Sequence, residues 1–221
     1  MTGKIERDSA ESRWPVILAI VAVLIVLVAL PDRVRLMPPW FMALSGALAI
    51  SPLLAVCLAS NKARWLTVER VVMLTLAAVL ACMTVVSLVD LVSLLILHST
   101  AISGLTLLTS SVAIWIINVL MFSLLYWQID RGGPGLGSSA GIRRPDWLFP
   151  QEGAPAEDLP FGWVPAFVDY LYLSFSTATA FSSTDVLPLT HRAKLLMMVE
   201  SSISLVTLVV VAARAINVLG S

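Results

Sequence analysis

The chain has 221 residues, of which 58% are hydrophobic and 13% are charged, and its mean hydropathy is +0.92. This composition argues against a soluble domain and indicates an integral membrane protein. The 14 basic and 14 acidic residues balance, and no basic run is present that could neutralise a nucleic-acid backbone, so nucleic acid is not expected as a partner.

Five apolar stretches are long enough to cross a hydrocarbon core of about 30 Å as helices. In chain order they are 14–30, 40–60, 71–97, 101–127 and 191–219. No small-residue cleavage site follows the first stretch, so we expect a retained helix and not a signal peptide. Pro52 in the second stretch predicts a kink. The third and fourth are separated by residues 98–100 alone, which predicts an antiparallel hairpin.

A polar stretch rich in glycine and proline, 128–162, follows the fourth span, and we expect a flexible exposed loop beside a pore entrance. The next segment, 163–179, carries apolar side chains at helical spacing but is too short to cross the membrane. It predicts a half-crossing, re-entrant helix, followed by a hydroxyl-rich turn over 180–185. The alternative is an interfacial helix followed by an ordinary loop, with Thr184 and Asp185 capping the last span.

Residues 177–190 resemble the pore module of the potassium-channel superfamily, whose pattern runs Thr-Ala-Thr-Thr-Val-Gly-Tyr-Gly-Asp-x-x-Pro-x-Thr. Without a gap, the pattern matches Thr177, Ala178, Thr179, Asp185, Pro188 and Thr190. The resemblance covers about the last quarter of the chain. It implies an outer helix at 101–127, a pore helix at 163–179, an inner helix at 191–219 and a tetramer around one axis. The implied ion pathway consists of Thr179, Ala180, Phe181, Ser182, Ser183, Thr184 and Asp185.

The filter itself departs from the family pattern. The family's Thr-Val-Gly-Tyr-Gly falls on 180–184, which read Ala-Phe-Ser-Ser-Thr, so both glycines and the tyrosine are missing. Those glycines let successive carbonyls point at a dehydrated ion, whereas a residue with a side chain adopts positive φ at a cost. We therefore expect a wider constriction that passes partly hydrated monovalent cations, with the selectivity left open.

Polar side chains inside two spans are costly in lipid and therefore candidates for function. Glu200, Ser204 and Thr207 follow one another at helical spacing on the last span, which predicts a polar stripe lining the pore. A protonated or paired Glu200 at a helix interface is the structural alternative. Asp90 on the third span is a possible buried coupling site, although a structural hydrogen bond to Asn118 is the preferred interpretation.

Together these features predict an all-α integral membrane protein with five transmembrane helices, a re-entrant pore helix and a filter-like loop, assembled as a homotetramer in the bilayer. Residues 1–13 form a tail, 14–100 a peripheral three-helix region and 101–221 the pore module. The predicted function is a monovalent-cation channel. The alternative is a secondary transporter, or a permease for small solutes or anions, that uses Asp90 or Glu200.

An enzyme is not expected, because the sequence has no metal-binding His/Glu spacing and no nucleophile elbow, and we predict no cofactor and no metal. In Ser183-Thr184-Asp185 and the helix that follows, the chain also resembles a family of bacterial inner-membrane proteins of similar length that has no established activity. That resemblance implies a multi-pass protein of the inner membrane of a bacterial cell.

Charge bias and the channel resemblance disagree about orientation. Basic residues of the tail, of the second loop and of 128–162 outnumber Arg33 and Arg35 of the first loop. The positive-inside rule therefore places the amino terminus and the pore entrance in the cytoplasm. Potassium channels have their filter facing outward, so the sequence leaves both orientations open.

Overall fold

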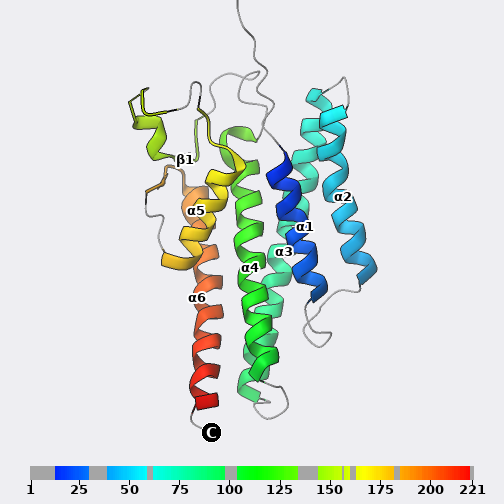
Figure 1. The fold of residues 1–221 in the computed structure, drawn as a ribbon, viewed down its shortest axis with the longest axis vertical. Helices are drawn as coiled ribbons and strands as arrows, with labels where there is room; N and C mark the ends of the chain where they lie inside the picture. Colours follow the sequence, from blue (N-terminus) through cyan, green and yellow to red (C-terminus); the bar gives the residue numbers. More distant parts are fainter. Residues whose placement is uncertain are drawn as a thin grey trace, which may run out of the picture.

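The computed structural model describes residues 13–29, 39–58, 62–97, 104–133, 144–155, 157–159, 163–181 and 185–219. Its helices are α1 (Trp14–Ala29), α2 (Pro39–Leu58), α3 (Lys62–Leu97), α4 (Gly104–Ile129), α5 (Phe167–Ala180) and α6 (His191–Leu219) (Figure 1). Between α4 and α5 lie two short 3-10 helices, η1 (Asp130–Gly132) and η2 (Pro150–Gly153). A two-stranded antiparallel sheet pairs β1 (Trp147–Leu148) with β2 (Leu187–Pro188).

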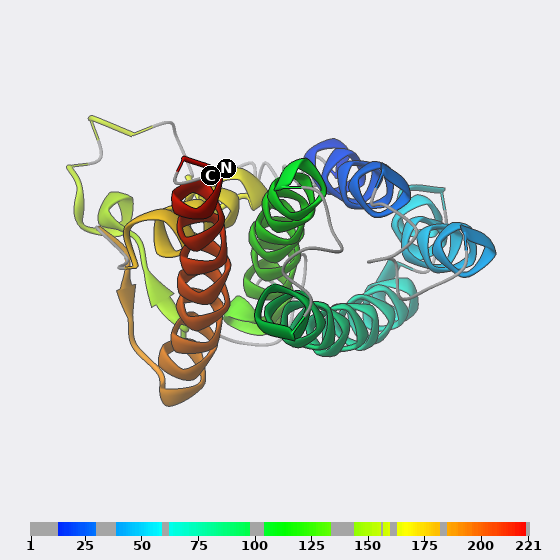
Figure 2. The ribbon, with the colours of Figure 1, turned by 90° about the horizontal axis from the view of Figure 1, so that it is seen from below.

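The long helices pack side by side, and α4 lies at the centre of the bundle. It contacts α1 and α3 on one side and α5 and α6 on the other. Seen from below, α1, α2 and α3 lie to one side of α4, and α6 lies to the other (Figure 2). Helices α4 and α6 run in opposite directions along the bundle (Figure 1). Helix α4 therefore connects the amino-terminal helices with the α5 and α6 part of the chain.

Three helices are long and apolar enough to cross a membrane, over Arg64–Asp90, Leu108–Ile129 and His191–Ala213. A helix satisfies its own backbone hydrogen bonds, which is what an apolar segment in lipid requires. These three segments indicate a membrane protein. Two further apolar helical stretches, Trp14–Ala29 and Ala43–Val56, are shorter. Pro52 lies inside α2.

The helix bounds agree with the predicted spans except where polar side chains extend a helix. Helix α3 begins at Lys62 and not at residue 71, and the added turns include a charged residue, Glu69, that is buried. Oε2 of Glu69 pairs with Nε of Arg13 at 3.3 Å, and Oε1 accepts a hydrogen bond from Gln128 Nε2 at 3.4 Å. The predicted tight connection at 98–100 lies outside the described residues.

Breaking this buried pair is expected to destabilise the bundle. Glu69→Ala leaves the Arg13 guanidinium buried without its carboxylate, and removal of one partner of a buried ion pair costs about 3–5 kcal/mol. Thermal unfolding in detergent measures the loss. Glu157→Ala is the matched control, because that side chain is exposed. Equal unfolding temperatures for the two variants would mean that the pair contributes nothing.

The predicted flexible loop at 128–162 is wrong over 128–133 and 144–148, because these two segments are folded against the bundle. Gln128, Asp130, Asp146 and Trp147 are all buried. Oδ1 of Asp130 accepts the backbone N–H of Asp146 at 2.6 Å, which holds these two segments together. The sequence predicted an exposed loop because the stretch is polar, and the pattern of a single sequence does not show that these polar groups bond to one another. Residues 134–143, 156 and 160–162 lie outside the described residues.

Candidate functional site

Helix α5 is a short helix that packs against both α4 and α6. Its 14 residues give a length of about 21 Å at 1.5 Å per residue. Figure 1 shows that α5 ends part way along α6, and that the chain then returns through β2 to the end of the bundle where α6 begins. The path of the chain is therefore a descending helix followed by an ascending turn.

Buried contacts fix the first half of α5. Oδ2 of Asp169 accepts the backbone N–H of Ala166 at 2.7 Å, which caps the helix amino terminus. The ring of Phe167 lies edge-on to that of Trp127, with centroids 6.0 Å apart. The hydroxyl of Tyr170 donates to Oδ2 of Asp130 at 2.7 Å. These contacts set the angle at which α5 leaves the end of the bundle.

The carboxyl end of α5 is exposed on the single chain. Phe181 follows the last helical residue in a left-handed conformation, φ 55° and ψ 22°, at the position where glycine usually ends a helix. The side chains of Thr179, Ala180, Phe181 and Asp185 are exposed. The last carbonyls of a helix carry a partial negative charge. The other residues predicted for the filter, Ser182, Ser183 and Thr184, lie outside the described residues.

The start of α6 is held by one buried carboxylate, Asp146. Its Oδ1 accepts hydrogen bonds from Thr190 Oγ1 and from Arg192 Nε, each at 2.6 Å. Thr190 also caps α6, because its Oγ1 accepts the backbone N–H of Ala193 at 3.2 Å. Thr190, one of the residues that match the channel pattern, therefore has a structural role in positioning α6 after the turn.

Glu200 lies in the interior of the chain where α4, α5 and α6 meet, and it is 0% exposed. Its Oε2 is hydrogen-bonded to the hydroxyl of Tyr126 on α4, and its Oε1 to the hydroxyl of Ser174 on α5. Nδ2 of Asn118 donates to the backbone carbonyl of Glu200 at 3.2 Å and to Ser204 Oγ at 3.0 Å. One carboxyl group thus joins three helices, and we call these five residues the Glu200 cluster.

The sequence predicted that the polar stripe of α6 lines the pore, and this prediction is wrong. Glu200, Ser204 and Thr207 are 0%, 0% and 1% exposed because they face the interior of their own chain. Helical periodicity identifies a polar face but does not tell whether that face meets the same chain or a second one. The exposed face on the opposite side of α6 carries Leu195, Met198, Ser202, Leu205 and Val209.

Asp90 is separate from the Glu200 cluster. Its side chain is exposed on α3, so it is not a buried coupling site. The predicted hydrogen bond between Asp90 and Asn118 is also wrong, because Nδ2 of Asn118 binds α6. Sequence reasoning missed the roles of Tyr126 and Ser174 in holding Glu200. A polar side chain on each neighbouring helix was the available signal, since a buried carboxyl group needs such partners.

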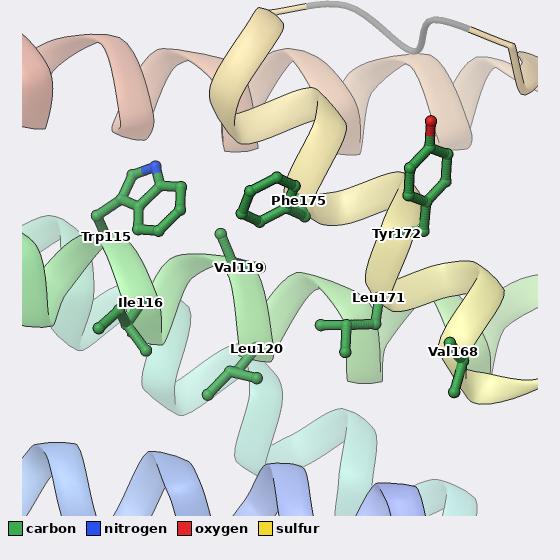
Figure 3. Close-up of a pocket in the computed structure, with 8 residues that line it drawn as sticks. All are labelled: Trp115, Ile116, Val119, Leu120, Val168, Leu171, Tyr172 and Phe175. Carbon is green, nitrogen blue, oxygen red and sulfur yellow. The ribbon is translucent and has the colours of Figure 1, made fainter.

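An open apolar groove of about 420 Å³ lies between α4 and α5 (Figure 3). Four side chains from each helix line it: Trp115, Ile116, Val119, Leu120, Val168, Leu171, Tyr172 and Phe175. The rings of Trp115 and Phe175 meet edge-on with centroids 5.8 Å apart. An apolar lining of this kind suits hydrocarbon and gives a cation no ligands.

The arrangement indicates a helical membrane protein in which a short helix, α5, packs against two antiparallel long helices, α4 and α6. No family model, no characterised protein and no solved structure matches the chain. Within the described parts of the chain, no group of three or more His, Cys, Asp or Glu side chains is placed to hold a metal ion.

Proposed function

We propose that this protein is a cation channel in which several copies of the chain, four in the arrangement that the sequence resemblance implies, surround one axis. Helices α4, α5 and α6 act as the outer, pore and inner helices. The observation that carries the proposal is the path of the chain through α5, which ends part way along α6 and returns to the end of the bundle where α6 begins.

The charge at the turn favours a cation. The free carbonyls at the end of α5 carry a partial negative charge, and the exposed Asp185 stands shortly after them in the chain. A ring of such groups from several subunits would attract cations and repel anions. Because Thr179, Ala180 and Phe181 are exposed on the single chain, they are available to face an axis shared with other subunits.

In this proposal the exposed face of α6, and not its polar face, lines the inner half of the ion pathway. Leu195, Met198, Ser202, Leu205 and Val209 lie on that face. Apolar constrictions of this kind gate channels by excluding water.

An assembly follows from this mechanism, because one half-crossing helix cannot enclose a pore. Its partners are other copies of the chain, the lipid bilayer and the permeating ions. Helices α1 to α3 form the periphery, and all five long helices cross the membrane in this proposal. The inner membrane of a bacterial cell is the proposed location.

Thiol modification tests the proposed lining directly. We expect Ser202→Cys channels in liposomes to lose at least half of their cation flux when a charged thiol reagent is added, because the added group would fill the path. Ser204→Cys is the matched control, since it lies on the same helix but is buried inside the chain. Cys57 and Cys82 are replaced by serine in both variants. Block of the Ser204→Cys variant alone would place the pathway inside the chain and contradict the proposal.

A secondary transporter is the second candidate, and the buried carboxyl group of Glu200 between three helices is the observation that favours it. Transporters bind substrates and coupling ions at interrupted helices near the middle of the membrane. The two functions differ in their kinetics: a transporter gives saturable uptake driven by a proton or sodium gradient, whereas a channel gives flux down the ion's own gradient in the absence of either.

A further inference from the structure

The hydroxyl of Ser174 makes two contacts in the Glu200 cluster. Ser174 Oγ lies 2.8 Å from the carbonyl oxygen of Val119 and is also within hydrogen-bond distance of Glu200 Oε1. A serine hydroxyl has a single hydrogen, so it donates only once, although it can accept as well. Ser174 can therefore donate to only one of these two oxygens, and in the other contact the hydrogen must come from Ser174's partner.

The carbonyl of Val119 can only accept, so the hydrogen of Ser174 belongs to that contact. The hydrogen between Ser174 and Oε1 must then come from the carboxyl group. Tyr126 completes the chain by donating its hydroxyl hydrogen to Oε2. Every contact is then satisfied by one order of donation, which we call the donor sequence: Tyr126 donates to Glu200, Glu200 to Ser174, and Ser174 to the carbonyl of Val119. With an ionised carboxylate, the 2.8 Å contact between Ser174 and Val119 would be left without a hydrogen.

The surroundings of Glu200 contain no compensating positive charge among the described residues. Tyr126 is the titratable group that faces it from α4. Titratable groups on α6 and on the elements packed against it bind other partners. These pairs are Asp169 with Ala166, Tyr170 with Asp130, Glu69 with Arg13, and Arg192 with Asp146. Arg70 lies beside Gly133. The other titratable side chains described on these helices are exposed: Arg64, Cys82, Asp90, Tyr172, His191 and Lys194. An isolated buried carboxylate is strongly unfavourable, so this setting favours the neutral acid.

We propose that Glu200 is a proton-binding site that holds its proton in this structure and loosens α5 when the proton leaves. On release, the bond between Oε1 and hydrogen breaks, the proton passes to water, and the carboxylate keeps the electron pair. The Ser174 hydroxyl then turns from Val119 to the carboxylate. Water must enter to solvate the new charge, and it does so by separating α5 from α6. This inference does not depend on channel activity.

Infrared spectroscopy of the wild-type protein in lipid tests the proton directly. We expect a carbonyl band of a protonated carboxylic acid at neutral pH that is absent from Glu200→Gln. The glutamine supplies an N–H donor where Oε1–H stood and a carbonyl where Oε2 stood, so it keeps the same donor sequence. Asp185→Asn is the control and keeps the band, because that carboxyl group is exposed. Absence of any Glu200-dependent band at neutral pH would overturn the proposal.

Ser174→Ala gives an independent assignment if the glutamine variant does not fold. It removes the acceptor of the carboxyl hydrogen but leaves the acid, so we expect the band to shift and not to disappear. An unchanged band in Ser174→Ala would contradict the proposed donor sequence.

Hydrogen exchange tests the consequence for α5. At each pH the exchange rate of α5 amides in the wild type is divided by the rate in Glu200→Gln, which cancels the intrinsic effect of pH. We expect this ratio to rise at least fivefold over the pH range in which the infrared band disappears. A constant ratio while the band disappears would show that proton release does not loosen α5. If the glutamine variant does not fold, peptides of α1 replace it as the internal reference.

Discussion

Glu200→Ala is expected to lower the free energy of unfolding by about 4 kcal/mol, from the summed effects of unpaired buried polar groups and a cavity. The substitution leaves the hydroxyl of Tyr126 buried without its acceptor and removes the partner of Ser174. It also opens a space at the point where α4, α5 and α6 meet. Reversible unfolding in mixed micelles, followed by the helical circular dichroism signal, measures the change.

Glu200→Gln is the matched control for that loss. It preserves the size of the side chain and the donor sequence, so we expect it to lie within about 1 kcal/mol of the wild type. A loss in the glutamine variant as large as that in the alanine variant would mean that the neutral amide cannot replace the native group, which contradicts the neutral acid inferred above.

Asp185→Asn is expected to lower cation flux about tenfold at low ionic strength, because clefts lined with one sign of charge raise the local concentration of the opposite ion by 10-fold or more. In an assembly the substitution removes one negative charge per subunit beside the proposed pathway. The initial rate of flux into liposomes containing equal amounts of protein measures the effect.

The salt dependence separates attraction of ions from damage to the fold. At an ionic strength near 1 M the screening length falls to about 3 Å, so the wild type and Asp185→Asn should converge. Asp158→Asn is the control, because it removes another exposed carboxylate outside the turn and should have no effect at either ionic strength. A tenfold loss that persists at high salt would show that Asp185 acts on structure and not on the ion.

The helices of the last part of the chain could be predicted closely from the sequence. The inner helix was predicted at 191–219, and α6 has these bounds, because a long apolar run is a strong local signal. The short helix was predicted at 163–179 and found at Phe167–Ala180. Its length was readable because hydroxyl residues end its apolar pattern.

Contacts between distant segments could not be predicted in the same way. The stripe of Glu200, Ser204 and Thr207 was recognised, but its direction depends on how α4 packs against α6. Likewise, Asp130 and Asp146 look like loop residues in the sequence. They are buried because they bond to each other and to Tyr170, Thr190 and Arg192, which are distant in the chain. Such pairings depend on tertiary structure, whereas hydropathy alone predicts that these residues are exposed to solvent.

The most direct test of the proposed function is a flux measurement on the purified wild-type chain in liposomes of neutral lipid. The account predicts that potassium or sodium enters down its own gradient, at a rate proportional to the amount of protein, with no proton or sodium gradient and with little chloride flux. Intact oligomers that pass none of the monovalent cations tested, at acidic, neutral and alkaline pH, would contradict it.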